Sequence, residues 1–568
     1  MLKTRYVLAS IGLLIVIFIA VMFFLPNLQV EKASKGKTYT ESVFDQSRVT
    51  NVDIKMDDDD LVSILENPTE KEIVNADVTI DGETVKNVGF RTKGNLSLNS
   101  VVQMEDSDRY SWKIDFDYYQ EDQDLHGLKK MALNNNYSDP TYMREYLSYE
   151  LMEKMGIATP GHSYMYVTIN GKEWGLYLGV EAIEETFLDT NFADGTGDLY
   201  YPDGTGSDLK WISDDIDDYT GINLKTNDNS DQSAMIKMLD VINNGGNLEE
   251  VLNVDEMLRY FAANTALVNL DHYQGDKKHN YYLYEENGVF SILPWDYNMS
   301  FGGYSGGGGR KGQAAEDEKA ADQKDAATVN GDTTAANDDD NAEFPGGSPN
   351  MNGGAMMDMS SNFMNESIIN FSITEPVSGT TLENRPLLNA LLSNEEYREK
   401  YYDYLDDIAT DFFSEENMTA ITTEISTLIS PYVEKDPTKF YTLDEYTEAT
   451  SGKETLVDFA TQRADSILAQ LSGDLVVEAE TESSMGGAAQ PPNMGGGENG
   501  AAMQPPNMGD GENGAAIKPP GMNENMGSQG VANSNYSKET IILSSVLLLL
   551  LFGAMAFAHF FKRRGKRG

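Results

Sequence analysis

The two ends of the chain carry the feature that most restricts its fold. Residues 7–25 and 541–561 are uncharged apolar runs, each about long enough to cross a bilayer as one helix. Basic residues lie between each run and the nearer end of the chain: Lys3, Arg5, Lys562, Arg563, Arg564, Lys566 and Arg567. Because positive flanks stay in the cytoplasm, both termini are expected there, and the residues between the two runs are expected to be exported.

The first apolar run permits two interpretations. It is longer than the core of a usual signal peptide, and no small-residue cleavage site of the A-x-A type follows it. These properties favour an uncleaved anchor over a cleaved signal. In either case the main domain is expected outside the cell membrane, held there by at least the second run.

The charge and the absence of cysteine exclude several kinds of site. The formal net charge is −50, from 92 acidic and 42 basic residues, and seven of the basic residues lie in the terminal flanks. A protein this acidic lacks the broad basic face that nucleic-acid binding needs. Zero cysteine excludes disulfides, Cys-ligated zinc, iron–sulfur clusters and Cys nucleophiles, and five histidines make a His-rich metal site unlikely to form.

Composition divides the exported part into four segments. Residues 38–301 mix strand-like and helix-like patterns, which predicts an α+β core. Residues 302–365 are rich in Gly, Ala, Asp, Asn and Met, as is typical of a disordered insertion. Residues 366–471 read as a helical C-terminal subdomain, and residues 472–540 contain a Gln-Pro-Pro-Asn-Met-Gly repeat typical of a flexible stalk. With the termini 1–6 and 562–568 and the two apolar runs, this gives eight segments.

Within the core, several elements are predicted individually. Alternating patterns predict strands over 72–80, 111–116, 164–169 and 280–284, and Asn170-Gly171 predicts a tight hairpin. Helices are predicted over 141–155, after Asp139-Pro140, and over 255–270, with Asp255 as the N-cap. The acidic run at 57–60 is expected to be a solvated helix start.

The densest group of chemically useful residues lies between Asn269 and Gly302. Asp271 ends a predicted helix, Asn280 opens an aromatic strand, and Asp296 follows a hairpin in Pro294-Trp295-Asp296. Phosphoryl transfer needs such a set: one carboxylate to accept a hydroxyl proton, and an amide oxygen and a second carboxylate to hold Mg²⁺. From the spacing alone, a loop aspartate and two turn-forming residues explain the same pattern, and Asn280 could equally cap the strand.

Cations that could hold phosphate groups gather upstream of this segment. Arg91 and Lys93 lie in FRTKGNLS, and Lys113 lies in the middle of the predicted strand SWKIDF. Glu145 follows Arg144 in the predicted helix after Asp139. A strand lysine paired with a helix glutamate is how kinase-type folds position the lysine on the α and β phosphates. The alternative for Lys113 is an ordinary strand lysine that points to solvent.

Taken together, these segments resemble the CotH kinase family, the spore-coat-protein-H-like atypical protein kinases. The matching pieces occur in the expected order over about residues 40–300, and we expect the helical part to about 471 to belong to the same domain. These pieces are FRTKGNLS, SWKIDFD, LNNNYSDPTYMREYLSYEL, TINGKEWGLYLGVEAIEETFL, LDHY, HNYYLY and LPWDYNMSFGG. The resemblance implies a diverged, two-lobed protein-kinase-like fold, here flanked by two transmembrane helices.

The resemblance also implies roles for individual residues. Asp271 would be the catalytic aspartate, and Asn280 and Asp296 would bind the metal. Lys113 and Glu145 would form the strand–helix ion pair, Arg91 and Lys93 would lie near the phosphates, and Glu181 would lie near the hinge that receives adenine. The implied cofactors are ATP and Mg²⁺ or Mn²⁺, and the implied partner is an exported envelope or spore-coat-type protein phosphorylated on Ser or Thr. A catalytically inactive kinase-like scaffold or adhesion protein is the alternative.

Overall fold

The computed structural model describes residues 37–104, 106–227, 229–304 and 363–477. The apolar runs 7–25 and 541–561 lie outside the described residues, as do most of the predicted insertion and almost all of the predicted stalk. Within the described ranges, no helix is both long and apolar enough to cross a membrane. The described residues belong to one compact unit, assigned to Lys32–Ala488.

The first half of this unit is built on a closed barrel of seven strands in the order β1-β2-β3-β4-β5-β7-β6. All neighbouring strands are antiparallel except β1 and β6, which pair in parallel. Their bounds are β1 Thr50–Met56, β2 Val74–Ile80, β3 Glu83–Lys93, β4 Ser111–Asp115, β5 Lys130–Asn134, β6 His162–Ile169 and β7 Lys172–Glu181. Closure leaves the barrel without an open strand edge.

Alternation along the strands separates the barrel interior from its outer face. Phe90 of β3 and Trp112 of β4 are buried inside and stack with their ring centroids 4.9 Å apart. The hairpin predicted at Asn170-Gly171 joins β6 to β7, and both residues have positive φ, 48° and 75°. This is the backbone that a two-residue hairpin requires, so the hairpin prediction is confirmed.

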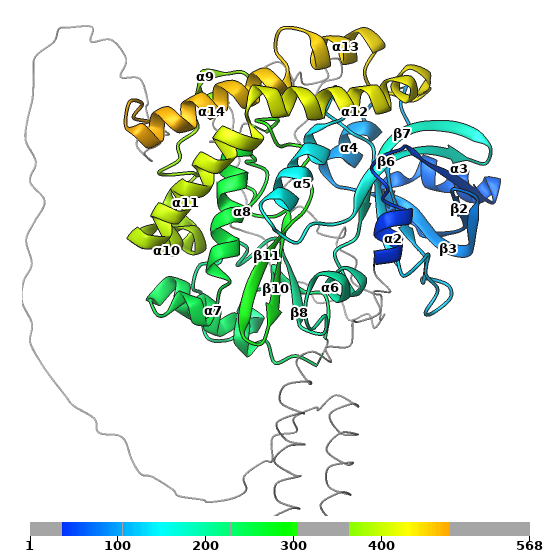
Figure 1. The fold of residues 1–568 in the computed structure, drawn as a ribbon. Coiled ribbons are helices and arrows are strands. Elements are labelled where there is room, and N and C mark those ends of the chain that lie inside the picture. The colour runs from blue at the N-terminus through cyan, green and yellow to red at the C-terminus, as the bar shows by residue number, and fades with distance from the viewer. Residues whose placement is uncertain (1–36, 105, 228, 305–362, 478–568) are drawn as a thin grey trace, which may run out of the picture. The chain divides into compact units, whose positions relative to one another are not determined.

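Short helices surround the barrel (Figure 1): α2 Lys37–Ser42, α3 Asp58–Glu66, α4 Leu96–Val102 and α5 Arg144–Lys154. The acidic run at 57–60 begins α3, with Asp57 as its N-cap, as predicted. Helix α5 starts three residues later than expected. The Asp139 carboxylate accepts hydrogen bonds from the backbone N–H groups of Thr141 and Arg144, so residues 140–143 form a capping turn instead of helix.

The second half contains a four-stranded sheet in the order β11-β10-β8-β9. Its strands are β8 Asp198–Pro202, β9 Ile222–Leu224, β10 Tyr281–Glu286 and β11 Val289–Pro294, and its helices are α6 Glu185–Asn191, α7 Ser233–Asn244 and α8 Val254–Leu267. Helix α8 packs on β11 and is almost wholly buried. It was expected to begin after an Asp255 cap, but it begins at Val254 after Asn253. It ends at Leu267 because Val268 adopts a left-handed φ of 48°.

The C-terminal region is helical, as predicted. It comprises α9 Glu366–Ile369, α10 Pro386–Ser393, α11 Glu395–Asp407, a π turn Ile408–Phe412, α12 Glu415–Lys435, α13 Leu443–Ser451 and α14 Leu456–Ser472. Figure 1 shows α12 and α14 side by side, with α12 reaching β7 of the barrel. Single-turn 3-10 helices occur at Pro68–Glu70, Ile216–Asp218, Leu248–Glu250 and Leu382–Asn384.

A buried ion pair attaches the helical region to the barrel. The side chains of Arg109, before β4, and Asp436, after α12, are both 0% exposed and lie 2.8 Å apart. The same carboxylate oxygen of Asp436 accepts from the backbone N–H of Leu176 in β7, at 2.8 Å. Gly175 makes room for this contact, because a Cβ at that position would come within 2.1 Å of the Asp436 carboxylate.

Candidate functional site

The predicted phosphate-binding cations share one face of the barrel. In the β3–β4 ladder, Arg91 lies opposite Lys113 and Lys93 lies opposite Ser111. Residues directly opposite in an antiparallel pair, and residues two apart in a strand, point to the same side of the sheet. Because Phe90 and Trp112 fill the barrel interior, the three cations face outward, and Arg91 and Lys93 are nevertheless buried.

Lys93 is connected to Glu145 of α5 through one side chain. The Nζ of Lys93 donates to the Oδ1 of Asn134 at 3.1 Å, and the Nδ2 of Asn134 donates to both carboxylate oxygens of Glu145, at 3.1 and 2.9 Å. Tyr149 also donates to Glu145, at 3.1 Å. The Lys93 ammonium lies 5.4 Å from the ring centroid of Trp295, the residue before Asp296. Lys93 therefore lies between the helix glutamate and the Pro-Trp-Asp segment.

Electrostatics place Asp296 beside this cluster. The pKa of Glu145 is raised to about 7, chiefly by burial and next by the negative charge of Asp296, while Asn134, Lys93 and Tyr149 act to lower it. The lysine whose charge acts on Glu145 is thus Lys93. The ion pair predicted between Lys113 and Glu145 stays a prediction.

Asp271 and Asn280 are joined by hydrogen bonds. The Nδ2 of Asn280 donates to the backbone carbonyl of Asp271 at 2.8 Å and to its carboxylate at 3.2 Å. Asn280 has a φ of 61° and directly precedes β10, so it occupies the strand-end position that the capping interpretation requires. Its amide nitrogen faces Asp271, which leaves the amide oxygen available to a cation.

His279 connects this pair to Asp296. Its Nε2 lies 3.5 Å from the Oδ1 of Asp271. Burial acts to lower the pKa of His279, but the contact with Asp271 and the charges of Asp203 and Asp296 outweigh it and raise the pKa. Two linked groups result: Asp271 with Asn280 and His279, and Glu145 with Asn134 and Lys93. The negative charge of Asp296 acts on His279 in the first group and on Glu145 in the second. The sequence motifs assign no role to Asn134, Tyr149 or Trp295, although all three lie inside them.

The loop that carries Asp271 is held by residues from beyond position 363. Arg385 donates to the backbone carbonyls of Tyr273 and Gly275, and the Nε2 of Gln274 donates to the carbonyl of Pro376 at 2.7 Å. The sequence offers no signal for these contacts, because more than a hundred residues separate the partners along the chain.

The donor chemistry of this centre suits a hard divalent cation. Among the described residues, no three or more His, Asp or Glu side chains are grouped closely enough to cage a metal ion. Mg²⁺ seldom uses such a cage: it binds one or two carboxylates and completes its shell with water and substrate phosphates. The metal-binding role predicted for Asp296 and Asn280 stays a prediction. Burial is the main cause of the raised pKa of Glu145, and the negative charge of Asp296, which a cation would offset, adds to it.

Glu181 lies at the end of β7, and its carboxylate is already engaged. Tyr39 of α2 donates to it at 2.5 Å, and the backbone N–H of Gly161 donates at 2.9 Å. Burial nevertheless raises the pKa of Glu181 to about 7. The binding role predicted for Glu181 stays a prediction.

The buried glutamates predict an unusual dependence of stability on pH. Because the pKa of Glu181 is about 7 in the folded protein and near 4.5 when unfolded, the folded state binds its proton more tightly. The contribution of Glu181 to the stability of the fold is therefore greatest below about pH 4.5 and is lost as the pH rises towards about 7. Between these pH values Glu181 lowers the free energy of unfolding by up to about 3 kcal/mol, and we expect this decrease to be absent in Glu181→Gln.

The measurement is the melting temperature of the protein and of Glu181→Gln at intervals from pH 5 to pH 8. The difference between the two should change with pH in favour of the variant at the alkaline end. Glu66→Gln, at an exposed position of α3, is the matched control and should track the unaltered protein. Parallel curves for all three proteins would contradict the prediction.

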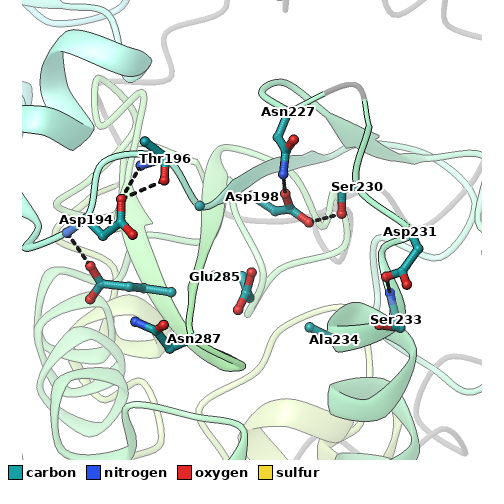
Figure 2. A pocket seen from close by; sticks show the side chains of 12 residues that line it. Asp194, Thr196, Asp198, Asn227, Ser230, Asp231, Ser233, Ala234, Glu285 and Asn287 are labelled. Carbon is teal, nitrogen blue, oxygen red and sulfur yellow. Dashed lines mark hydrogen bonds between the residues drawn. The ribbon is translucent and has the colours of Figure 1, made fainter. Parts of the chain in front are cut away.

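A second, separate pocket is strongly acidic (Figure 2). It encloses about 310 Å³ beside β8 and the β10–β11 turn, and its lining contains no lysine or arginine: Asp194, Thr196, Gly197, Asp198, Asn227, Ser230, Asp231, Ser233, Ala234, Glu285, Glu286 and Asn287. Figure 2 shows Asn227 and Ser230 converging on Asp198, to which both donate. These internal bonds occupy the carboxylate, and none of the predicted site residues lines this pocket.

Comparison with known proteins matches most of the chain, from the end of β3 to α14, to one family. The sequence model of the CotH kinase protein family matches residues 90–467. The inner spore coat protein H of Bacillus subtilis (strain 168) is 30% identical over 190 residues, which cover 31% of this chain and 51% of that protein. An inner spore coat protein H-like protein of the same organism is 29% identical over 92 residues, 16% of this chain and 28% of that protein. The chain thus spans about half the length, or less, of these curated relatives.

Proposed function

Because the chain belongs to the CotH kinase protein family, we propose that it is a membrane-anchored, extracellular atypical protein kinase. It would transfer the γ-phosphoryl group of ATP to Ser or Thr of an exported protein. Two sets of contacts support this proposal: the hydrogen bonds from Lys93 through Asn134 to Glu145, and the hydrogen bond between Asn280 and Asp271. The charge of Asp296 acts on Glu145 and on His279 beside Asp271. Three carboxylates, one amide and one buried lysine are the kinds of group that phosphoryl transfer uses.

Each residue has a role that its contacts support. Asp271 would accept the proton of the substrate hydroxyl, oriented by Asn280 and His279. Lys93 would contact the phosphates, with Glu145 and Asn134 holding it in place, and Arg91 and Lys113 would add positive charge on the same face. Asn280 and Asp296 would hold Mg²⁺ or Mn²⁺. That ion, when bound, supplies charge neutralisation on the phosphate oxygens.

The setting follows from the relatives and from the chain's own ends. Both curated relatives are named as inner spore coat proteins of the H type, so we propose an envelope or spore-coat-type protein as the substrate. The apolar runs at 7–25 and 541–561 would anchor the protein in the cell membrane with both termini in the cytoplasm. With a net charge of −50, nucleic acid is not a proposed partner.

The test is transfer of ³²P from labelled ATP by the purified full chain, with Mg²⁺ or Mn²⁺, to itself and to a Ser-rich acceptor protein. We expect incorporation by the unaltered protein and none above background by Asp296→Ala, because that substitution removes a metal ligand. A thermal-shift assay with ATP and Mg²⁺ accompanies it, and bound nucleotide should raise the melting temperature by several degrees.

The outcomes separate the kinase from its alternative. Equally low incorporation by the unaltered protein and Asp296→Ala, without stabilisation by nucleotide, would support a catalytically inactive kinase-like scaffold. Asp203→Ala is the control, because it removes a carboxylate near His279 that the proposal gives no role.

A further inference from the structure

A cavity of about 560 Å³ lies at the N-terminal end of α5, apart from the centre described above. Residues of the turn before α5 line one side of it, including Ser138, Thr141 and Arg144, and all three are buried. Phe363 and Tyr441 add aromatic surface. The remaining side comes from α13 and the loop after it, whose charged residues are exposed.

Arg144 is the unusual member of this lining. Its side chain is 1% exposed, and its guanidinium makes one hydrogen bond, from Nη1 to the backbone carbonyl of Ser138 at 3.1 Å. Its Nε has no acceptor, and no described carboxylate lies within ion-pair distance of the group. The carboxylate of the neighbouring Asp139 accepts hydrogen bonds from the backbone N–H of Arg144 and from the backbone N–H and hydroxyl of Thr141. The face of the guanidinium lies 5.6 Å from the ring centroid of Phe363.

A buried guanidinium without a counter-ion is unfavourable, because burial removes the hydration that stabilises its charge. Arg presents parallel N–H donors that match the oxygens of a phosphate or carboxylate group. Ser138 lines the same cavity, and a serine hydroxyl can act as a further donor. The cavity therefore has the donors and the positive charge for a compact oxyanion.

The exposed charged residues of the cavity limit the charge of the anion that can bind. Glu445, Glu448 and Glu454 oppose an anion, and Lys453 favours it. All four are exposed, so water and salt screen them, whereas the buried Arg144 is screened much less. Glu445 is in addition held by the backbone N–H and hydroxyl of Thr442 in a capping box. This arrangement admits a single phosphate group and disfavours a polyanion such as a triphosphate.

We propose that this cavity is a binding site for a phosphate-type oxyanion, held by Arg144, and that the bound anion stabilises the start of α5. That position is coupled to the proposed catalytic centre by short contacts. The backbone carbonyl of Arg144 accepts from Ser148 at 2.7 Å and from Ser300, four residues after Asp296, at 3.2 Å. The next residue in α5 is Glu145. An anion at Arg144 thus acts on both elements that position Lys93 and Asp296.

The experiment is isothermal titration calorimetry of the full chain in detergent at constant ionic strength. Inorganic phosphate is the first probe and phosphothreonine the second. We expect at least one of them to bind, and Arg144→Gln to weaken that binding at least about tenfold, because the charged fork is lost. Binding of phosphothreonine identifies a phosphorylated side chain as a source, whereas binding of phosphate alone identifies the free ion.

Two further variants keep the result interpretable. Lys453→Gln removes an exposed charge from the same cavity and should change the affinity much less than Arg144→Gln. Ala449→Met places a larger side chain in the cavity from the half-buried face of α13 and should also weaken binding. This variant replaces Arg144→Gln in the titration if Arg144→Gln lowers the melting temperature too far. Absence of binding by both probes, or equal affinity in the unaltered protein, Arg144→Gln and Ala449→Met, would overturn the proposal.

The oxyanion site stands independently of the kinase proposal. Asp296→Ala should abolish stabilisation by ATP and Mg²⁺ and leave phosphate binding intact. A protein that binds phosphate through Arg144 but never responds to ATP would retain the oxyanion site and lose the kinase function.

Discussion

Replacement of Asp271 by Asn is expected to lower ³²P transfer by about 10²–10⁴-fold, because the variant loses the group that accepts the hydroxyl proton. Asn keeps a carbonyl oxygen, so the hydrogen bond from Asn280 can persist and the loop can keep its conformation. Stabilisation by ATP and Mg²⁺ should therefore remain close to that of the unaltered protein. The measurement combines initial rates of ³²P incorporation with a nucleotide thermal-shift assay on the same preparations.

The matched control is Asp276→Asn, five residues further along the same loop. Asp276 lies 3.7 Å from Lys277 and accepts from Tyr304 at 3.0 Å, and the proposed mechanism gives it no part in proton transfer. Its transfer rate should stay near that of the unaltered protein. If Asp271→Asn transfers phosphate as fast as Asp276→Asn, Asp271 is not the proton acceptor.

The second large effect concerns stability. Asp436→Asn should lower the free energy of unfolding by about 3–5 kcal/mol, because it leaves Arg109 charged, buried and without its carboxylate partner. The substitution also weakens the acceptor for the backbone N–H of Leu176. The shift of the midpoint in urea-induced unfolding measures this cost.

A surface ion pair provides the comparison. Lys154 and Asp411 lie 2.7 Å apart, and their side chains are 40% and 66% exposed. Asp411→Asn should cost no more than about 1 kcal/mol, because water screens an exposed pair and solvates the remaining lysine. Equal midpoints for Asp436→Asn and Asp411→Asn would show that the buried pair does not hold the helical region on the barrel. Arg109→Met combined with Asp436→Leu should recover part of the loss, since no unpaired charge remains.

Local sequence signals predicted many individual elements. Asn170-Gly171 gave the hairpin between β6 and β7, and the acidic run gave the start of α3, because turn and cap residues act over a few positions. Helix boundaries were less predictable. The first residues of α5 and α8 depend on which side chain reaches a free backbone N–H, and Asp139 rather than Pro140 decides where α5 begins.

The candidate site shows the same division. Asp271, Asn280 and Asp296 could be selected from the sequence, because they lie within one segment around a predicted hairpin. The residue that interacts with Glu145 could not be selected from the sequence. Lys93 and Lys113 both lie in strands, on the same outward face of the barrel, and nothing in either strand indicates which lysine lies near α5. The structure connects Lys93 to Glu145 through Asn134, which comes from a third strand.

The sequence by itself determined the acidic character, the absence of cysteine chemistry, the α+β core with its helical C-terminal region and the family. These properties follow from the composition, from the spacing of apolar residues along the chain and from motifs that are continuous in the sequence. Only the tertiary structure decided that Arg385 holds the Asp271 loop, that Asp436 neutralises Arg109 and that Arg144 lies buried beside a cavity. The physical reason is that burial and pairing of a charge depend on residues far apart in the chain, which no local pattern records.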